Sequence, residues 1–237
     1  MIHCDLIISH EYIKDEDLAG KTVVVIDTLR ATSVLTTALA NGASQVQCVS
    51  EPEEALALKV KRPDRLLGGE RNSLAIAGFD FSNSPLEYTK EAVKGRTLIM
   101  TTSNGTKTLL KATAAQDVLI GCLLNARAVM ERAISLDRDI VFINAGTAGR
   151  FSLDDYIPAG AMLGTTNTQV ELSDIARGAL LLYQAHPDIH SALTNCRHYR
   201  RLQDLGLTAD LDYCLTKDRF DLVPIFQDGL VTRPNQL

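Results

Sequence analysis

The sequence has no tryptophan, and aromatic residues make up only 5% of its 237 positions. Proteins that bind single-stranded nucleic acid rely on exposed aromatic side chains to stack the bases. The charge balance points the same way, because 24 basic and 29 acidic residues give a net charge of −5. A chain of this sign lacks the basic surface that attracts nucleic acid or anionic lipid. We therefore expect neither nucleic acid nor a membrane among its partners.

Long apolar runs are also missing. No uninterrupted stretch approaches the roughly 18 apolar residues that suggest a membrane span. The start of the chain, Met1–Asp5, lacks the basic and apolar regions of a signal peptide. These two observations predict a cytoplasmic protein.

Cysteine is sparse and scattered. The five cysteines are odd in number and contain no Cys-x-x-Cys pair, so neither a disulfide framework nor a zinc site is expected. Cys48 and Cys122 occupy matching places in or beside apolar runs. We interpret both as buried, small apolar residues.

Several motifs of phosphate chemistry are absent. The run Gly105–Thr108 is not a Walker loop, because Gly-Lys-Ser/Thr and the earlier glycine are both lacking. Leu29 stands where an Asp-x-Asp mechanism would need a second aspartate after Asp27, and the segment from Cys122 to Arg127 encloses one residue too few for Cys-x5-Arg.

The five histidines lie outside the polar clusters in sequence. His186 and His190 have the i, i+4 spacing of a metal pair, but Pro187 interrupts that helix. Carboxylates, arginine, threonine and asparagine remain, and they point to hard-cation chemistry with Mg²⁺.

Short runs rich in Val, Ile and Leu predict the strands. They are unbroken rather than alternating, as in strands covered on both faces, and helical segments separate them. This order predicts βαβ units and a largely parallel sheet. The predicted strands are Thr22–Ile26, Val46–Val49, Arg65–Leu67, Thr97–Thr101, Val118–Ile120 and Ile140–Ile143.

The chain after Asp155 is predicted to be mainly helical, with helices over 171–184 and 191–205. A last strand-like piece, Asp221–Phe226, contains Pro224. Proline has no N–H to donate, so we expect this piece at a sheet edge or in irregular structure.

Two stretches share one layout. Lys21–Thr32 and Arg96–Thr106 are each an apolar run that ends in a polar cluster before a helix, offset by about 75 positions. We predict an α/β fold of two similar α/β halves from an internal duplication, with mixed, mostly parallel sheets in a three-layer αβα arrangement. The first unit would span residues 1–95. The second would span 96–237 and include the C-terminal helices and a returning edge strand.

The polar ends of these strands are the candidate site, because open α/β sheets bind ligands there. Asp27 with Arg30, and Glu70 with Arg71, each pair a carboxylate that can hold a cation with a guanidinium that can hold an anion. Helix capping and local ion pairs explain the same residues structurally, so both interpretations stay open. The same holds for Asn83 and Ser84, which could donate to an anion or simply form a turn.

Two further clusters have equally open interpretations. Thr102, Asn104, Gly105 and Thr106 precede a helix, where N–H groups can receive an anion or the hydroxyls can cap the helix. The pair Asp154–Asp155 could bind a metal ion or favour the start of a helix.

The combination of these motifs resembles the 2-phosphosulfolactate phosphatase (ComB) family. The resemblance rests on Val25–Thr32, Asn41–Gly42, Leu67–Arg71, Gly78–Asp80, Asn83–Pro85, Thr102–Thr106, Phe151–Asp155 with Ala159–Gly160, and Asp210–Leu215 with Asp218 and Val223–Pro224. Asp154 departs from it, since glutamate is expected there.

The resemblance implies an Mg²⁺-dependent hydrolase that removes phosphate from 2-phospho-3-sulfolactate on the route to coenzyme M, or from a similar phosphorylated hydroxy acid. Its partner would be that small phosphorylated acid, and a homodimer is a further expectation. The alternative is a non-catalytic phosphometabolite-binding protein. The expected roles are catalysis for Asp27, Arg30, Glu70 and Arg71; substrate binding for Thr32, Asn83, Ser84, Thr102, Asn104, Gly105 and Thr106; and metal binding for Asp27, Glu70, Asp154 and Asp155.

Overall fold

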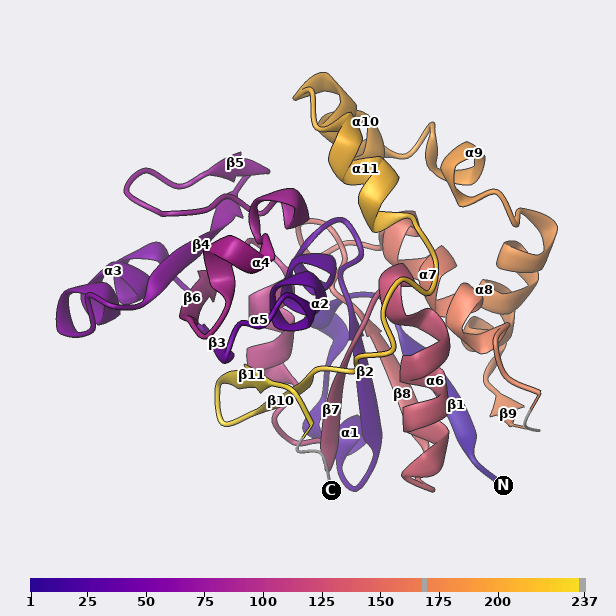
Figure 1. The fold of residues 1–237 in the computed structure, drawn as a ribbon. Coiled ribbons are helices and arrows are strands. Elements are labelled where there is room, and N and C mark those ends of the chain that lie inside the picture. The colour runs from indigo at the N-terminus through magenta and orange to yellow at the C-terminus, as the bar shows by residue number, and fades with distance from the viewer. Residues whose placement is uncertain (168–169, 235–237) are drawn as a thin grey trace.

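The computed structural model describes residues 1–167 and 170–234. One sheet runs through the molecule, with the strand order β5-β4-β6-β3-β11-β10-β7-β2-β8-β1-β9 (Figure 1). The strands are β1 His3–Ile7, β2 Thr22–Ile26, β3 Gln45–Cys48, β4 Leu66–Arg71, β5 Leu74–Ala75, β6 Thr97–Thr101, β7 Asp117–Gly121, β8 Ile140–Asn144, β9 Glu171–Leu172, β10 Ile225–Gln227 and β11 Leu230–Thr232.

Helices cover both faces of this sheet. The helices are α1 Asp15–Leu18, α2 Ala31–Ala40, α3 Pro52–Lys61, α4 Lys90–Val93, α5 Gly105–Lys111, α6 Ala126–Ser135, α7 Leu153–Leu163, α8 Asp174–Ala185, α9 Ile189–Leu193, α10 Arg197–Asp204 and α11 Thr208–Cys214. Short 3₁₀ turns cover His10–Tyr12, Pro85–Glu87 and Leu123–Asn125.

The predicted α/β class and the mostly parallel sheet are confirmed. All six predicted strands are present, with ends shifted by a few residues. β2 and β8 are buried along their whole length, which explains their unbroken apolar sequences. Among the described residues, no helix has the length and hydropathy that a membrane span requires.

The core forms three layers. In β2, Val23 and Val25 pack with α2 and α5 on one face, whereas Val24 and Ile26 pack with α6, α7 and α8 on the other. Cys48 and Cys122 are buried in or beside their strands, as predicted.

The chain after residue 170 differs from the sequence prediction in two places. Glu171 and Leu172 form the short strand β9, and α8 begins only at Asp174, because the Ser173 hydroxyl accepts the Ala176 N–H and caps it. The predicted helix over 191–205 is two helices, α9 and α10, separated at residues 194–196.

The last strand-like piece, Asp221–Phe226, was predicted at a sheet edge or in irregular structure. Residues 221–224 are irregular, as the second alternative states, but the edge placement is wrong for the strand that follows. β10 and β11 form a hairpin inside the sheet, between β7 and β3. Pro224 precedes β10 and uses only its carbonyl, which accepts the Ile120 N–H at 2.9 Å. The hairpin joins the two halves of the sheet, while the proline stays outside the strand.

The strands of the two proposed units interleave. β2 lies between β7 and β8, and β6 lies between β3 and β4, all in parallel pairs. Thr22 is opposite Asp117, and Thr97, 75 positions after Thr22, is opposite Gln45. The central strands of both halves therefore have similar neighbours. Origin by duplication, and the division after residue 95, stay predictions.

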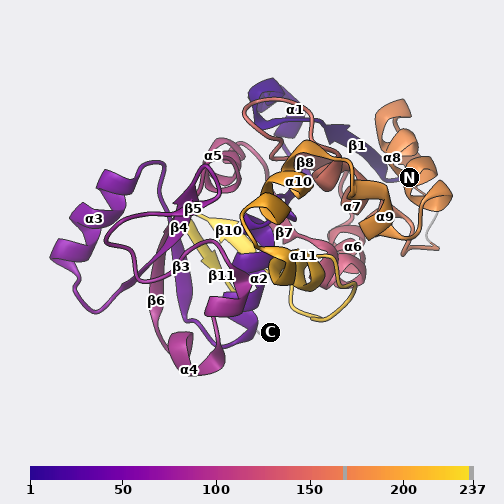
Figure 2. The same ribbon diagram turned by 90° about the horizontal axis from the view of Figure 1, so that it is seen from above.

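The C-terminal helices α9, α10 and α11 form a third cluster that contacts the loop after β2. Tyr199, Leu202 and Leu211 pack there with Leu29. Seen from above, α10 and α11 lie over the centre of the molecule (Figure 2). This arrangement places α10 beside the carboxyl ends of the parallel strands.

Candidate active site

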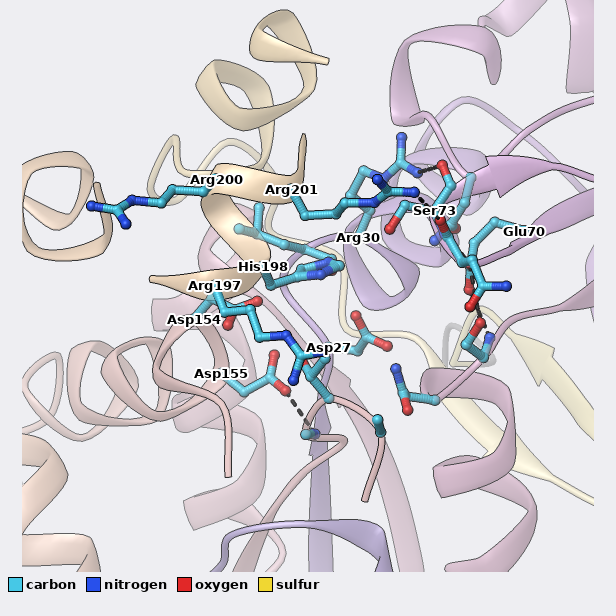
Figure 3. Close-up of a pocket in the computed structure, with 18 of the residues that line it drawn as sticks. Asp27, Arg30, Glu70, Ser73, Asp154, Asp155, Arg197, His198, Arg200 and Arg201 are labelled. Carbon is cyan, nitrogen blue, oxygen red and sulfur yellow. Dashed lines mark hydrogen bonds between the residues drawn. The ribbon is translucent and has the colours of Figure 1, made fainter. Parts of the chain in front are cut away.

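A cavity of about 1030 Å³ opens at the carboxyl ends of β2, β4, β6 and β8, and α10 forms one of its walls (Figure 3). This is where parallel α/β sheets place their ligand sites. Of the predicted site residues, those that line the cavity are Asp27, Arg30, Glu70, Asn83, Asn104, Asp154 and Asp155. Those that lie outside its lining are Thr32, Arg71, Ser84, Thr102, Gly105 and Thr106.

Asp27 directly follows β2 and is buried. Its Oδ1 accepts the Ala31 N–H at 3.3 Å, and its own N–H donates to the Thr32 hydroxyl at 3.1 Å. Burial raises the pKa of Asp27 to about 6; the nearby His198 and the Ala31 N–H oppose this shift, and the charge of Glu70 adds to it. A carboxylate held this way keeps Oδ2 free of hydrogen bonds from the described residues.

Asp155 joins two loops. Its Oδ1 accepts the Thr28 N–H at 3.1 Å and its Oδ2 accepts the Gly146 N–H at 3.0 Å. Burial raises the pKa of Asp155, and the charges of Asp154 and Asp27 raise it further. Asp154 is buried beside it and binds the Ser152 hydroxyl through Oδ1.

Glu70, at the end of β4, has a similar role in the other half. Its Oε1 accepts the Ser103 N–H and its Oε2 accepts the Ser73 N–H, both at 2.7 Å. Ser103 follows β6 as Thr28 follows β2. Each half therefore uses one buried carboxylate to hold the loop after its central strand.

The segment Thr102–Thr106 is held mainly by its own hydroxyls. The Thr106 N–H donates to the Thr102 hydroxyl at 3.0 Å, and the Thr102 N–H donates to the Thr106 hydroxyl at 2.9 Å. A Cβ on Gly105 would lie 2.5 Å from the Ala31 Cβ and 2.7 Å from Asp27 Oδ2. Gly105 thus allows close approach of α2 and Asp27, and Ser103 and Asn104 are the members of this segment that line the cavity.

Arg30 is buried and forms an ion pair. Its partner is Asp210 and not Asp27, which a purely local structural role would have required. Its Nη1 donates to Asp210 Oδ2 at 2.5 Å, and its Nη2 donates to the Ser73 carbonyl at 3.2 Å. The second Asp210 oxygen accepts the Ser84 hydroxyl at 2.7 Å. Ser84 and Asp210 therefore orient Arg30, which itself lines the cavity.

Arg71 points away from the site. Its guanidinium donates to the carbonyls of Glu70 and Ser50 and to the Thr101 hydroxyl, at 2.7 to 2.9 Å. These bonds hold the ends of β4 and β6 together. The catalytic role that the sequence suggested for Arg71 stays a prediction. These contacts, and its position outside the cavity lining, do not support it.

The sequence interpretation missed the cationic face of α10. Arg197, His198, Arg200 and Arg201 line the cavity, with Arg197 close to Asp154 and Asp155 (Figure 3). The histidines had been placed apart from the site by their sequence positions, but His198 Nε2 lies 2.8 Å from the Leu29 carbonyl. The detectable signal was the concentration of Arg and His within Arg197–Arg201 in an acidic chain.

The donor set can be compared with what Mg²⁺ requires. Within residues 1–167 and 170–234, no three His, Cys, Asp or Glu side chains form a ready-made metal cluster. Mg²⁺ often binds through only one or two carboxylates, together with water and substrate phosphate. Asp27 and Asp154, each buried on the cavity wall, satisfy that smaller requirement.

Comparison with known proteins identifies the family of this chain. The family model described as 2-phosphosulpholactate phosphatase matches residues 7–229. The chain belongs to this family. A relative from Clostridium novyi is 49% identical over 97% of this chain and 99% of its own length, and one from Clostridium tetani is 48% identical over 97% and 100%. A third, from Caldanaerobacter subterraneus, is 48% identical over 94% and 95%.

All three relatives are named probable 2-phosphosulfolactate phosphatase. Membership places the chain among the hydrolases of phosphoric monoesters. The matched residues 7–229 contain every side chain of the cavity described above.

Proposed function

We propose that the chain is an Mg²⁺-dependent phosphomonoesterase that hydrolyses 2-phospho-3-sulfolactate, or a similar small phosphorylated hydroxy acid, to the free acid and phosphate. The names of its relatives support the reaction. The observation that carries the proposal is the pairing, in one cavity, of the buried carboxylate Asp27 with the cations Arg30, Arg197 and Arg201.

The cations match a substrate with several negative charges. Figure 3 shows the Arg197 guanidinium reaching toward Asp27 and Asp155, while Arg201 extends toward Arg30. Guanidinium groups bind phosphate, carboxylate and sulfonate oxygens through charge-assisted hydrogen bonds. An enzyme for this substrate class would need cations spread along the cavity, because a phosphoryl group and an acid group must both be held.

The carboxylates account for the proposed metal. Asp27 and Asp154 would hold Mg²⁺, which when bound neutralises charge on the transferring phosphoryl group. Glu70 and Asp155 already accept backbone N–H groups with both oxygens. Their main contribution in this proposal is to hold the loops that carry Asp27 and Asn104 in place.

The hydrolysis adds water across the phosphoester. The water oxygen bonds to phosphorus, the bond from phosphorus to the substrate oxygen breaks, and that oxygen takes up a proton. A carbonyl can only accept, so His198 Nε2 carries the hydrogen that it donates to the Leu29 carbonyl. His198 Nδ1 is therefore the ring nitrogen left to hold or move a proton.

The second candidate is a non-catalytic protein that binds a phosphorylated metabolite. Such a protein needs the arginines but gains nothing from Asp27 and Asp154, which repel an anion when no cation is bound. The buried carboxylates and the family membership therefore favour the enzyme. The place in coenzyme M formation, the cytoplasmic location and the homodimer stay proposals.

Phosphate release from a panel of phosphoesters tests the proposal. The panel contains 2-phospho-3-sulfolactate, 2-phospholactate and glycerol 2-phosphate, each with Mg²⁺ and with a chelator. With Mg²⁺ we expect fast release from the two phospho acids and slow but measurable release from glycerol 2-phosphate, and with the chelator we expect little release from any of them. Stoichiometric binding of these compounds without release under any condition would favour the binding protein, and full activity in the chelator would remove Mg²⁺ from the proposal.

A further inference from the structure

Two arginines from distant parts of the chain meet at the β4–β5 turn. Arg30 Nη2 donates to the Ser73 carbonyl at 3.2 Å, and Arg201 Nη2 approaches the neighbouring Asn72 carbonyl at 3.5 Å. Arg30 follows β2, whereas Arg201 belongs to α10. Figure 3 shows Arg201 extending across the cavity toward Arg30 and Ser73.

The turn that receives them is well defined. Asn72 and Ser73 have positive φ angles of 54° and 68°, as in the two-residue hairpin turns that join adjacent antiparallel strands. Glu70 Oε2 accepts the Ser73 N–H at 2.7 Å. The backbone of the turn is thereby fixed, and its two consecutive carbonyls hold the two guanidinium groups at one end of the cavity.

The charges at this end are incompletely balanced. Asp210 neutralises Arg30 from the buried side, but Arg201 has no ion pair with any acidic side chain in the described part of the chain. Glu70 binds this turn and Asp204 also lines the cavity, but neither carboxylate forms an ion pair with Arg201, whose guanidinium donates to a neutral carbonyl. An anion placed between the Arg30 and Arg201 guanidinium groups would supply that partner.

This end differs from the part of the cavity that suits the phosphoryl group. Asp27 and Asp155 lie at the other side, where Arg197 reaches them (Figure 3). A ligand with two separated anionic groups could therefore use both ends at once, with its phosphate near Asp27 and its other acid group near Arg201.

We infer that Arg201, together with Arg30, forms the subsite for the non-phosphate acid group of the substrate, a carboxylate or sulfonate. Arg201 is then a residue that determines specificity, because it separates phosphorylated acids from phosphoesters that lack an acid group. This inference rests on the proposed function for its phosphoryl site.

The test compares Arg201→Gln with wild type on two substrates, 2-phospho-3-sulfolactate and glycerol 2-phosphate. Losing a charge-assisted contact should raise KM for the phospho acid by about 10- to 150-fold. The kcat/KM for glycerol 2-phosphate should change less than about threefold, since that compound has no acid group to lose. Arg201→Lys should recover part of the affinity, because it restores the charge without the planar fork.

Arg200→Gln is the matched control. Arg200 lies next to Arg201 on α10, has the same charge and also lines the cavity, but its guanidinium donates to the Asn195 side chain and extends away from Arg30 and Ser73 (Figure 3). We expect Arg200→Gln to keep the KM of wild type for both substrates. Equal losses in the two variants would show that only the general positive charge of α10 matters, and would overturn the subsite.

A binding measurement separates this inference from the proposed reaction. Sulfolactate contains the acid groups without phosphate, so its affinity can be measured by calorimetry even if no phosphoester is hydrolysed. Weaker binding to Arg201→Gln than to wild type and Arg200→Gln supports the subsite in either case. Unchanged sulfolactate affinity, or an equal loss of kcat/KM on both substrates, contradicts it.

Discussion

The Arg30 guanidinium forms a buried ion pair with Asp210, with 2.5 Å between Nη1 and Oδ2, although the two residues are 180 positions apart in the sequence. The side chains are only 2% and 3% exposed. This contact ties the loop after β2 to α11, and it fixes one cation of the cavity. The C-terminal helices are therefore part of the site's construction.

We predict that Asp210→Asn destabilises the fold. Removing one partner of a buried ion pair leaves an uncompensated charge, and such changes lower the free energy of unfolding by about 3 to 5 kcal/mol. Denaturant unfolding measures the difference. The control is Asp221→Asn. Asp221 forms an ion pair with Arg127 at the surface, where the two side chains are 86% and 50% exposed. This variant should lower the free energy of unfolding by less than about 1 kcal/mol. Equal midpoints for the two variants would contradict a structural role for Asp210.

A second prediction concerns Gly105→Ala. The new Cβ would lie 2.5 Å from the Ala31 Cβ and 2.7 Å from Asp27 Oδ2, so α5 or Asp27 must move. Overpacking of this kind destabilises by about 1 to 3 kcal/mol. A shift of the reacting groups by about 1 Å can lower the rate by about 100-fold. Circular dichroism should show that the variant is folded. We expect its kcat to fall by about 100-fold, while its free energy of unfolding falls by no more than about 3 kcal/mol. Wild-type turnover would mean that Asp27 needs no such close contact.

A third prediction uses the cysteines. Burial raises the pKa of Cys48 to about 12 and that of Cys122 to about 11, so both stay protonated thiols at neutral pH. Burial also raises the pKa of Cys196, but this side chain is only partly buried and is therefore accessible to a reagent. Because the thiolate is the reactive form, iodoacetamide at pH 8 should modify Cys196 in the native protein and spare Cys48 and Cys122. Peptide mass mapping measures the labelling of each cysteine, and denatured protein is the control. Rapid labelling of Cys48 in the native protein would contradict the burial of its side chain.

The sequence was sufficient to predict the central strands, because burial on both faces requires unbroken apolar runs such as Thr22–Ile26. It was not sufficient for β1, whose buried Cys4 and Leu6 alternate with exposed His3 and Asp5 in a run too short to stand out. It predicted an edge strand or irregular structure around Pro224, and residues 221–224 are irregular, but it did not predict that the next residues lie inside the sheet. The hairpin that follows lies inside the sheet because β10 pairs with β7 and β11 pairs with β3. Both partner strands are distant in the sequence, so no local pattern predicts this pairing.

The same distinction applies to the site. Asp27 and Glu70 were found because each follows an apolar strand, which is a local signal. The functions of His198 and Arg201 depend on where α10 lies relative to the loop after β2, and that position is set by apolar contacts such as Leu202 with Leu29. The sequence can predict which residues share one side of α10, but it cannot predict which part of the protein His198 and Arg201 face.

Asp27 is the residue on which the proposed activity depends most directly. It is buried at the end of β2 and lines the cavity, and its Oδ2 accepts no hydrogen bond from the described residues. Asp27→Asn keeps the size of the side chain and an oxygen that can accept the Ala31 N–H, but removes the charge. Its fold, checked by thermal unfolding, should therefore be retained.

The most direct measurement is kcat/KM for 2-phospho-3-sulfolactate in Mg²⁺, for wild type and Asp27→Asn side by side. Loss of a charge that acts on the reacting phosphoryl group should lower kcat/KM by about 1000-fold or more, equivalent to about 4 kcal/mol of transition-state stabilisation. We expect this loss in a variant that unfolds at nearly the wild-type temperature. A folded Asp27→Asn enzyme that retains kcat/KM within threefold of wild type would contradict it.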